Sequence, residues 1–122
     1  MAVSAVIQIS GQASGGEGGG KTYGPLTITS ATACLHTQVI VLQSGANTIT
    51  IPTTPAPTGC IIALPSTNTA VTTLKGVAGD TGIAIGKTTR HVLCWDPTAV
   101  PASFVLNSAA TQTGLVTEIS YF

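Results

Sequence analysis

Residues 34–75 read CLHTQVIVLQSGANTITIPTTPAPTGCIIALPSTNTAVTTLK, and this stretch decides the fold class. It contains short runs of aliphatic and β-branched residues, several of them alternating with polar residues, as strands do. Clusters of Gly, Pro, Asn and Ser separate the runs at residues 44–47, 52–57 and 65–68, and these residue types favour turns. No part of the stretch keeps a 3.6-residue period for three turns, so it predicts successive β-strands without helix.

The same pattern continues toward both ends of the chain. Ten strands are predicted, at Val3–Ile9, Leu26–Ser30, Cys34–Leu42, Thr48–Ile51, Gly59–Leu64, Ala70–Lys75, Gly82–Ile85, His91–Trp95, Ser103–Leu106 and Val116–Phe122. Many short strands without crossover helices predict an all-β fold, either an antiparallel β-sandwich or a jelly roll. A small barrel is the alternative.

Charge is unusually scarce in this chain of 122 residues, which is long enough for one domain. Charged residues make up 7%, against about 25% in an ordinary soluble domain. Four cations and a net charge of zero exclude the basic surface that nucleic-acid binding requires. Because near-zero net charge promotes association, the composition predicts a protein that works in contact with other proteins.

The sequence shows neither an export signal nor a membrane span. The first ten residues lack the cationic and apolar segments of a signal peptide, and no apolar run approaches the roughly 20 residues of a spanning helix. Three cysteines, Cys34, Cys60 and Cys94, lie far apart and are odd in number, unlike a disulfide framework. We expect all three to be reduced and buried, because each lies in an apolar run.

The N-terminal region differs in composition from the rest. Ser10–Gly20 holds six glycines and no apolar residue larger than Ala, which predicts a flexible arm. The chain therefore divides into an N-terminal strand and Gly-rich arm, residues 1–20, and a β-sandwich domain, residues 21–122. A strand on a flexible tether needs a sheet edge to receive it, so we expect Met1–Ile9 to dock on a neighbouring subunit or on another protein of an assembly. The docking residues are predicted to be Val3, Val6, Ile7 and Ile9.

Two sequence motifs match known functional sites in spacing or residue type, but the surrounding sequence does not support either function. Gly15, Gly20, Lys21 and Thr22 have the spacing of a phosphate-binding loop, but Gly24 and Pro25 exclude the helix that must follow such a loop. The triplet at residues 80–82, Asp-Thr-Gly, resembles that of aspartic proteases but occurs once. It predicts a tight turn instead, with Gly79 and Gly82 flanking Asp80.

Metal binding and catalysis find equally little support. Cys34, His36, His91 and Cys94 have the ligand chemistry of a zinc site, but in a straight strand residues 91 and 94 point to opposite faces. A bend at residue 92 or 93 is needed to reconcile them. No nucleophile elbow, paired-carboxylate cluster or metalloprotease motif occurs. We therefore predict no enzyme, no cofactor and no metal.

The C-terminal strand ends on two aromatic residues, Tyr121 and Phe122. An exposed strand of this kind is an aggregation edge. We expect it to pair within the sheet or to be buried against a neighbouring subunit, and Tyr121 and Phe122 join the predicted contacts with a partner protein.

Three segments carry a resemblance to a known group of proteins. They are TTLKGVAGDTGIAIG at 72–86, SFVLNSAA at 103–110 and VTEISYF at 116–122. They resemble small β-rich structural proteins of tailed bacteriophages, among them head decoration (cement) and tail-associated proteins. The resemblance covers about the last 50 residues and implies a non-enzymatic virion component that assembles as a symmetric oligomer, often a trimer, on the capsid.

The expected function is therefore that of a capsid decoration or cement protein that stabilises the phage head. Its partners are expected to be further copies of itself and the major capsid protein or another virion protein, with no nucleic acid and no membrane. It is expected on the capsid surface of the virion, after synthesis in the host cytoplasm. The alternative is a tail-associated receptor- or carbohydrate-binding β-domain, which requires exposed aromatic residues to stack on sugars.

Overall fold

The computed structural model describes residues 5–13, 21–30, 36–96 and 98–122. Within these residues the chain is all-β and contains no helix, which confirms the predicted class. The strands are β1 Ala5–Ala13, β2 Lys21–Ser30, β3 His36–Ile40, β4 Gly45–Thr50, β5 Gly59–Ala63, β6 Thr72–Lys75, β7 Ile83–Ile85, β8 Arg90–Cys94, β9 Ser103–Ser108 and β10 Thr117–Tyr121. Each of the ten predicted strands has a counterpart, with bounds shifted by a few residues.

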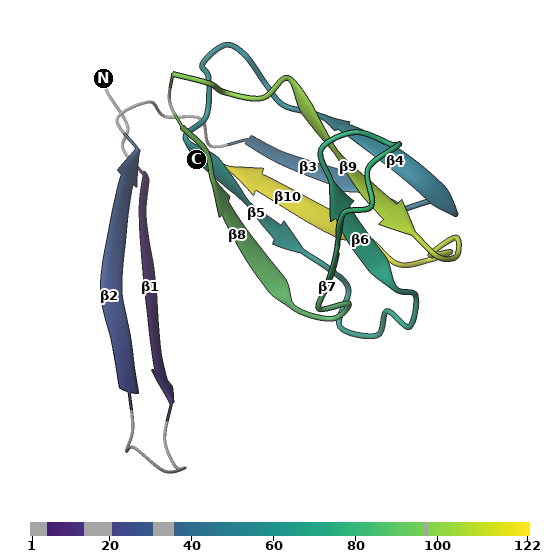
Figure 1. The fold of residues 1–122 in the computed structure, drawn as a ribbon, viewed down its shortest axis with the longest axis horizontal. Helices are drawn as coiled ribbons and strands as arrows, with labels where there is room; N and C mark the ends of the chain where they lie inside the picture. Colours follow the sequence, from purple (N-terminus) through teal and green to yellow (C-terminus); the bar gives the residue numbers. More distant parts are fainter. Residues whose placement is uncertain (1–4, 14–20, 31–35, 97) are drawn as a thin grey trace.

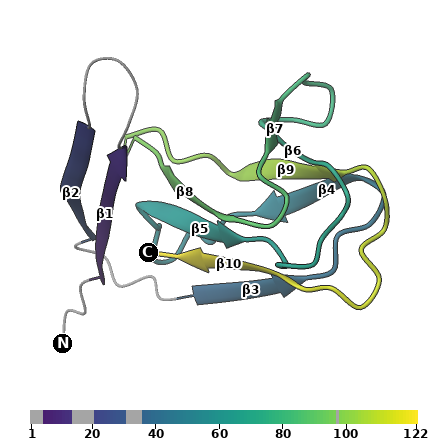
Figure 2. The ribbon, with the colours of Figure 1, turned by 90° about the horizontal axis from the view of Figure 1, so that it is seen from below.

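Eight of the strands form two antiparallel sheets of four strands each (Figure 1). One sheet has the order β3-β10-β5-β8 and the other β4-β9-β6-β7. Figure 2 shows the two sheets stacked one above the other, which confirms the predicted antiparallel β-sandwich. The edge strands β3 and β4 lie in different sheets although they are consecutive in the chain, and the same holds for the edge strands β7 and β8. The chain therefore crosses from one sheet to the other at each pair of edges.

The core fills the space between the sheets. Strand alternation sends every second residue inward. The core residues are Leu42, Ile49, Ile51, Cys60, Ile62, Leu64, Phe104, Leu106, Ile119 and Tyr121. The outward residues of the same strands are mainly small, hydroxyl-bearing or aliphatic, and Glu118 is the charged one among those of β4, β5, β9 and β10.

The C-terminal aromatics belong to this core and not to an interface. Tyr121 is 1% exposed and Phe122 is 2% exposed within the single chain. The Tyr121 hydroxyl donates to Gln38 Oε1 at 3.1 Å, and the Phe122 backbone exchanges hydrogen bonds with Gly59. Of the two expected arrangements, pairing within the sheet is the one found, and their assignment as subunit or capsid contacts is corrected because neither side chain has surface left for a partner.

The N-terminal strand pairs with its own chain. β1 and β2 form an antiparallel two-stranded sheet, running from the pair Ala5–Ser30 to the pair Ala13–Lys21, with a register shift between Ile9 and Gly11. Residues 21–30, expected in the sandwich domain, thus lie in this hairpin, and the four-stranded sheets begin at His36. Residues 10–13 of the expected arm are strand, while residues 14–20 and Val3 lie outside the described residues.

The cysteines differ from one another in exposure. Cys60 is fully buried in the core, and this burial, with a smaller contribution from Cys94, raises the pKa of its thiol to about 12. Cys94 is a free, exposed thiol, so its predicted burial is wrong. The reason is strand alternation at the sheet edge, where Leu93 takes the inward position and Cys94 the outward one. Cys34 lies outside the described residues.

Candidate functional site

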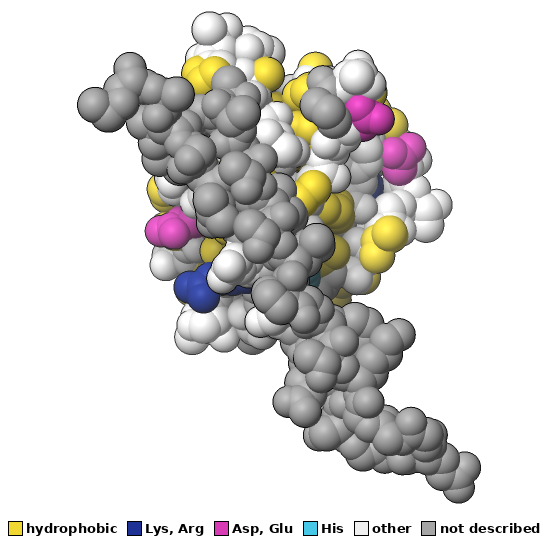
Figure 3. All heavy atoms as spheres, turned by 90° about the vertical axis from the view of Figure 1, so that its left-hand side faces the viewer, with side chains coloured by type: hydrophobic (Ala, Val, Ile, Leu, Met, Phe, Trp, Pro, Cys, Tyr) yellow, Lys and Arg dark blue, Asp and Glu magenta, His cyan; other side chains and the backbone are white. Residues whose placement is uncertain are grey.

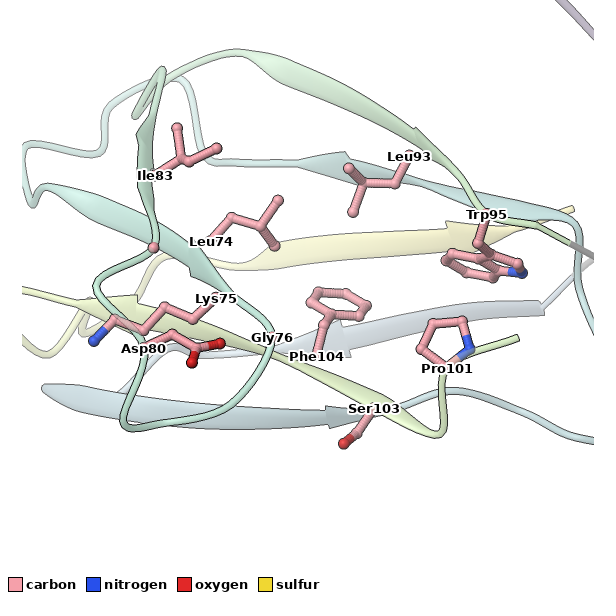
Figure 4. A pocket seen from close by; sticks show the side chains of 11 residues that line it. Leu74, Lys75, Gly76, Asp80, Ile83, Leu93, Trp95, Pro101, Ser103 and Phe104 are labelled. Atoms are coloured by element: carbon pink, nitrogen blue, oxygen red, sulfur yellow. The ribbon is translucent and has the colours of Figure 1, made fainter. Parts of the chain in front are cut away.

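An apolar groove lies between the edges of the two sheets, where β7 and β8 diverge from the turn at residues 86–89 (Figure 4). Its volume is about 440 Å³. The apolar residues that line it come from both sheets and from the segment that leads into β9, namely Leu74, Ile83, Leu93, Trp95, Pro101 and Phe104. Pockets of this size with apolar and aromatic walls are typical binding sites.

A tight turn places one wall of the groove. The Asp80 carboxylate accepts a hydrogen bond from Val77 N at 2.9 Å, and Asp80 N donates to Val77 O at 3.1 Å. Gly82 then adopts a φ of +72°, and a Cβ there would lie 2.5 Å from Leu74 O. A tight turn is thus found where the sequence predicts one, but its hydrogen bonds span Val77–Asp80, and Gly82 follows it in a conformation that requires glycine. The turn brings β7 back beside β6, with Ile83 opposite Leu74.

Trp95 forms the other end of the groove and is held in place by its ring nitrogen. Its Nε1 donates to Pro57 O at 2.7 Å. The following loop is ordered by Asp96, whose Oδ1 accepts from Thr98 N at 2.8 Å and from Thr98 Oγ1 at 2.6 Å. These bonds stabilise the carboxylate and lower the pKa of Asp96. The loop ordered in this way leads to Pro101 in the groove wall.

Two opposite charges border the groove at the turn. Lys75 and Asp80 both belong to the lining, and Lys75 Nζ donates to Ala78 O at 3.5 Å. The other lining residues are uncharged. Ile83 is 71% exposed although it faces this apolar space. The groove therefore suits an apolar occupant without net charge.

The outer face of the β3-β10-β5-β8 sheet is a second surface with little charge. One row across it consists of Val39, Glu118, Ala63 and Arg90, and the next of Thr37, Ser120, Ile61 and Val92. Val39 is 61% exposed. Figure 3, another view of the surface, likewise shows charged side chains as isolated spots among hydrophobic and other side chains.

The structure separates the residues of the hypothetical zinc site. His36 lies on β3 and His91 on β8, at opposite edges of one sheet, and Cys34 lies outside the described residues. His91 Nε2 instead contacts Gly86 O at 2.8 Å and Thr89 Oγ1 at 3.0 Å. Across residues 5–13, 21–30, 36–96 and 98–122, no group of three metal-ligating side chains comes together.

The other predicted site residues lie in the hairpin. Lys21 and Thr22 begin strand β2, so a strand stands where a phosphate-binding loop requires a helix. Val6, Ile7 and Ile9 lie in β1, where the register pairs Ile7 with Ile28 and Ile9 with Leu26. Their contact with a neighbouring subunit stays a prediction.

Comparison with protein-family models, with curated proteins and with solved structures finds no match for this chain. No helix in the part of the chain that the structure describes is long and apolar enough to cross a membrane.

The groove was not predicted from the sequence, although the sequence contains two features related to it. Residues 82–86 read Gly-Ile-Ala-Ile-Gly, which indicates an apolar strand of three residues between two glycines. Such a short strand at a sheet edge leaves part of the opposite sheet uncovered. Trp95 is the single tryptophan in a chain with 4% aromatic residues. Neither signal shows by itself that the two segments lie opposite one another.

Proposed function

We propose that this chain is a non-enzymatic structural protein of a virion, a decoration or cement protein that assembles with copies of itself on the capsid surface. The observation that carries the proposal is the β1–β2 hairpin, which pairs with neither sheet of the sandwich. An isolated two-stranded hairpin is marginally stable in water and gains stability by packing on a further surface. In an assembly, a neighbouring protein supplies that surface.

The register of the hairpin supports this role. It pairs Ile7 with Ile28 and Ile9 with Leu26, and strand alternation puts these four residues on one face of the ribbon. Gln8, on the alternate face, is exposed. An amphipathic two-stranded ribbon is suited to lie on a protein surface with its apolar face down.

The surface composition and the sequence resemblance support the same conclusion. The outer sheet face that carries Val39, Ile61 and Val92 includes one carboxylate and one guanidinium group among the residues of its two central rows. A flat, weakly charged face suits a protein neighbour. Strands β6, β7, β9 and β10 hold the segments that resemble structural proteins of tailed bacteriophages.

Co-assembly with the capsid protein encoded in the same genome tests the proposal. The full chain is expected to sediment with capsid particles in a density gradient, and Ile7→Asp is expected to weaken that association by at least tenfold. Gln8→Asp adds the same charge on the alternate face of the ribbon and is expected to leave it unchanged. A full chain that stays at the top of the gradient with intact particles contradicts the proposal.

A second candidate function, carbohydrate binding by a tail-associated domain, is favoured by one observation. Trp95 is half-buried and lines an open groove, where an aromatic ring can stack on a sugar. Since Trp95 is the only tryptophan, its fluorescence reports on the groove directly. Saturable fluorescence changes with oligosaccharides, lost in Trp95→Leu, favour this function, whereas an unchanged spectrum at millimolar sugar contradicts it.

A further inference from the structure

Strand β8 has an unpaired edge in the part of the chain that the structure describes. Its ladder with β5 is flanked by hydrogen bonds from Trp95 N to Thr58 O and from Leu64 N to Thr89 O, both 3.2 Å. In an antiparallel ladder, alternate residues direct their backbone groups to the partner strand. Residues 89, 91, 93 and 95 therefore face β5, and the N–H and C=O groups of Val92 and Cys94 face away from it.

The same edge borders the apolar groove. Leu93, from β8, lines the groove, whose opposite wall is Ile83 on the three-residue strand β7. β7 is too short to cover the groove, and Ile83 remains 71% exposed. An added strand that is apolar on one face satisfies both features, because its backbone pairs with β8 while its apolar face covers the groove.

Strand β1 has the chemistry of such a strand. Ala5, Ile7 and Ile9 alternate with Val6, Gln8 and Ser10, and Gln8 and Ser10 are exposed. β1 contains no charged residue, which matches a groove whose two charges, Lys75 and Asp80, are opposite in sign.

The two edges of the hairpin are not equivalent. β2 carries Lys21 and Pro25, and a charge and a residue without an N–H both protect an edge from pairing. β1 carries neither, so nothing in its own sequence protects its outer edge from pairing.

We propose that β1 of a second copy of this chain adds to the free edge of β8, with the face that carries Ile7 and Ile9 over the groove. The inference rests on the proposed function in taking another copy as the partner. β1 and β2 of the partner then extend the β3-β10-β5-β8 sheet from four strands to six.

The area of the hairpin favours a reciprocal exchange. Nine residues of strand span about 30 Å and two strands about 10 Å, so one face of the ribbon covers about 300 Å². One docked hairpin removes at most about 600 Å² from water, counting both surfaces, which is below the range of specific interfaces. Two hairpins exchanged in a symmetric dimer remove up to about 1,200 Å², which reaches the lower end of that range.

Disulfide trapping tests the arrangement, because Cys94 is an exposed thiol at the receiving edge. In a Cys34→Ser background, single cysteines are placed at Val6, Gln8 and Ser10, on one face of β1, and at Ile7 and Ile9, on the other. Isotopically labelled and unlabelled chains are mixed and oxidised, and the linked peptides are identified by mass spectrometry.

A link from Cys94 to at least one of the three even positions, and between chains, is expected. Links at odd positions alone, links within one chain, or no link at any position overturn the proposal.

A proline variant provides the independent test. Val92→Pro removes an N–H that faces away from β5, so it blocks strand addition, whereas Val92→Thr keeps that N–H. Light scattering is expected to give half the mass for Val92→Pro and an unchanged mass for Val92→Thr, with matching circular dichroism. A wild-type chain that is monomeric at 50 μM overturns the inference, while the gradient experiment with capsid particles decides the proposed function separately.

Discussion

Gly82 allows the chain to turn back so that β7, one wall of the groove, pairs with β6. Its φ of +72° is a conformation that other residues adopt at a cost, and a Cβ there would meet Leu74 O at 2.5 Å. We expect Gly82→Ala to lower the free energy of unfolding by about 1–3 kcal/mol, as measured in urea. Gly79→Ala is the matched control, because a Cβ at Gly79 meets nothing within 4 Å. An equal effect of both substitutions contradicts this account.

The buried thiol of Cys60 predicts a pH dependence of stability. Its pKa is raised from 9.0 to about 12 in the folded protein, so between these values the unfolded chain loses a proton that the folded chain keeps. Stability contributed by this thiol is therefore complete below pH 9 and is lost as the pH rises, by up to about 1.4 kcal/mol per pH unit. Urea unfolding from pH 8 to 11 measures the loss.

Cys60→Ala is the control for that measurement, since it removes the titrating group. It is expected to be less stable at pH 8 because a buried side chain is truncated, and to show a shallower decline above pH 9. Identical slopes for the two proteins would assign the decline to other groups.

At the scale of elements, the central position of β10 leads us to expect a large effect from a small C-terminal truncation. It is a central strand, paired with β3 on one side and β5 on the other, and it ends in buried Tyr121 and Phe122. We expect deletion of these two residues to cost more than the roughly 3–5 kcal/mol of one large core truncation and to unfold the sandwich. Thermal unfolding followed by circular dichroism measures it.

Ile83→Thr provides the comparison for that deletion. Ile83 is also apolar and lies in a strand, but its side chain is 71% exposed within the single chain, so in a chain of residues 31–122, which lacks the docking strand, the change is expected to stay within about 0.5 kcal/mol. If Ile83→Thr destabilises the chain as much as the deletion does, Ile83 is covered in solution.

At the scale of the whole molecule, the hairpin and the sandwich are predicted to fold separately. Among the residues that the structure describes, β1 and β2 pair with each other alone, and the buried core cluster lies within residues 42–121. We therefore expect a chain of residues 31–122 to keep the strand content and the cooperative unfolding of the sandwich. Loss of cooperative unfolding in that chain contradicts separate folding.

Local patterns in the sequence are sufficient to predict the strands. Alternation of apolar and polar residues and the turn chemistry at positions such as 44–47 and 79–82 act within a few residues, so all ten strands and the all-β class follow from local patterns. The apolar run at residues 60–64 also predicted that Cys60 is buried, but the same argument was wrong for Cys94, because one face of an apolar run at a sheet edge stays in water.

The order of the strands within the sheets, in contrast, follows from the folded chain as a whole. Leu93 and Ile83 lie on different sheets, and their meeting across the groove depends on a pairing order, β3-β10-β5-β8 over β4-β9-β6-β7, that joins segments far apart in the chain. The pairing of β1 with β2 likewise could not be read from the sequence, because the strands are similar in composition and several of them could pair with the same edge. Strand formation is a local property of the chain, whereas the choice among edges is made by the total burial and hydrogen bonding of the assembled sheets.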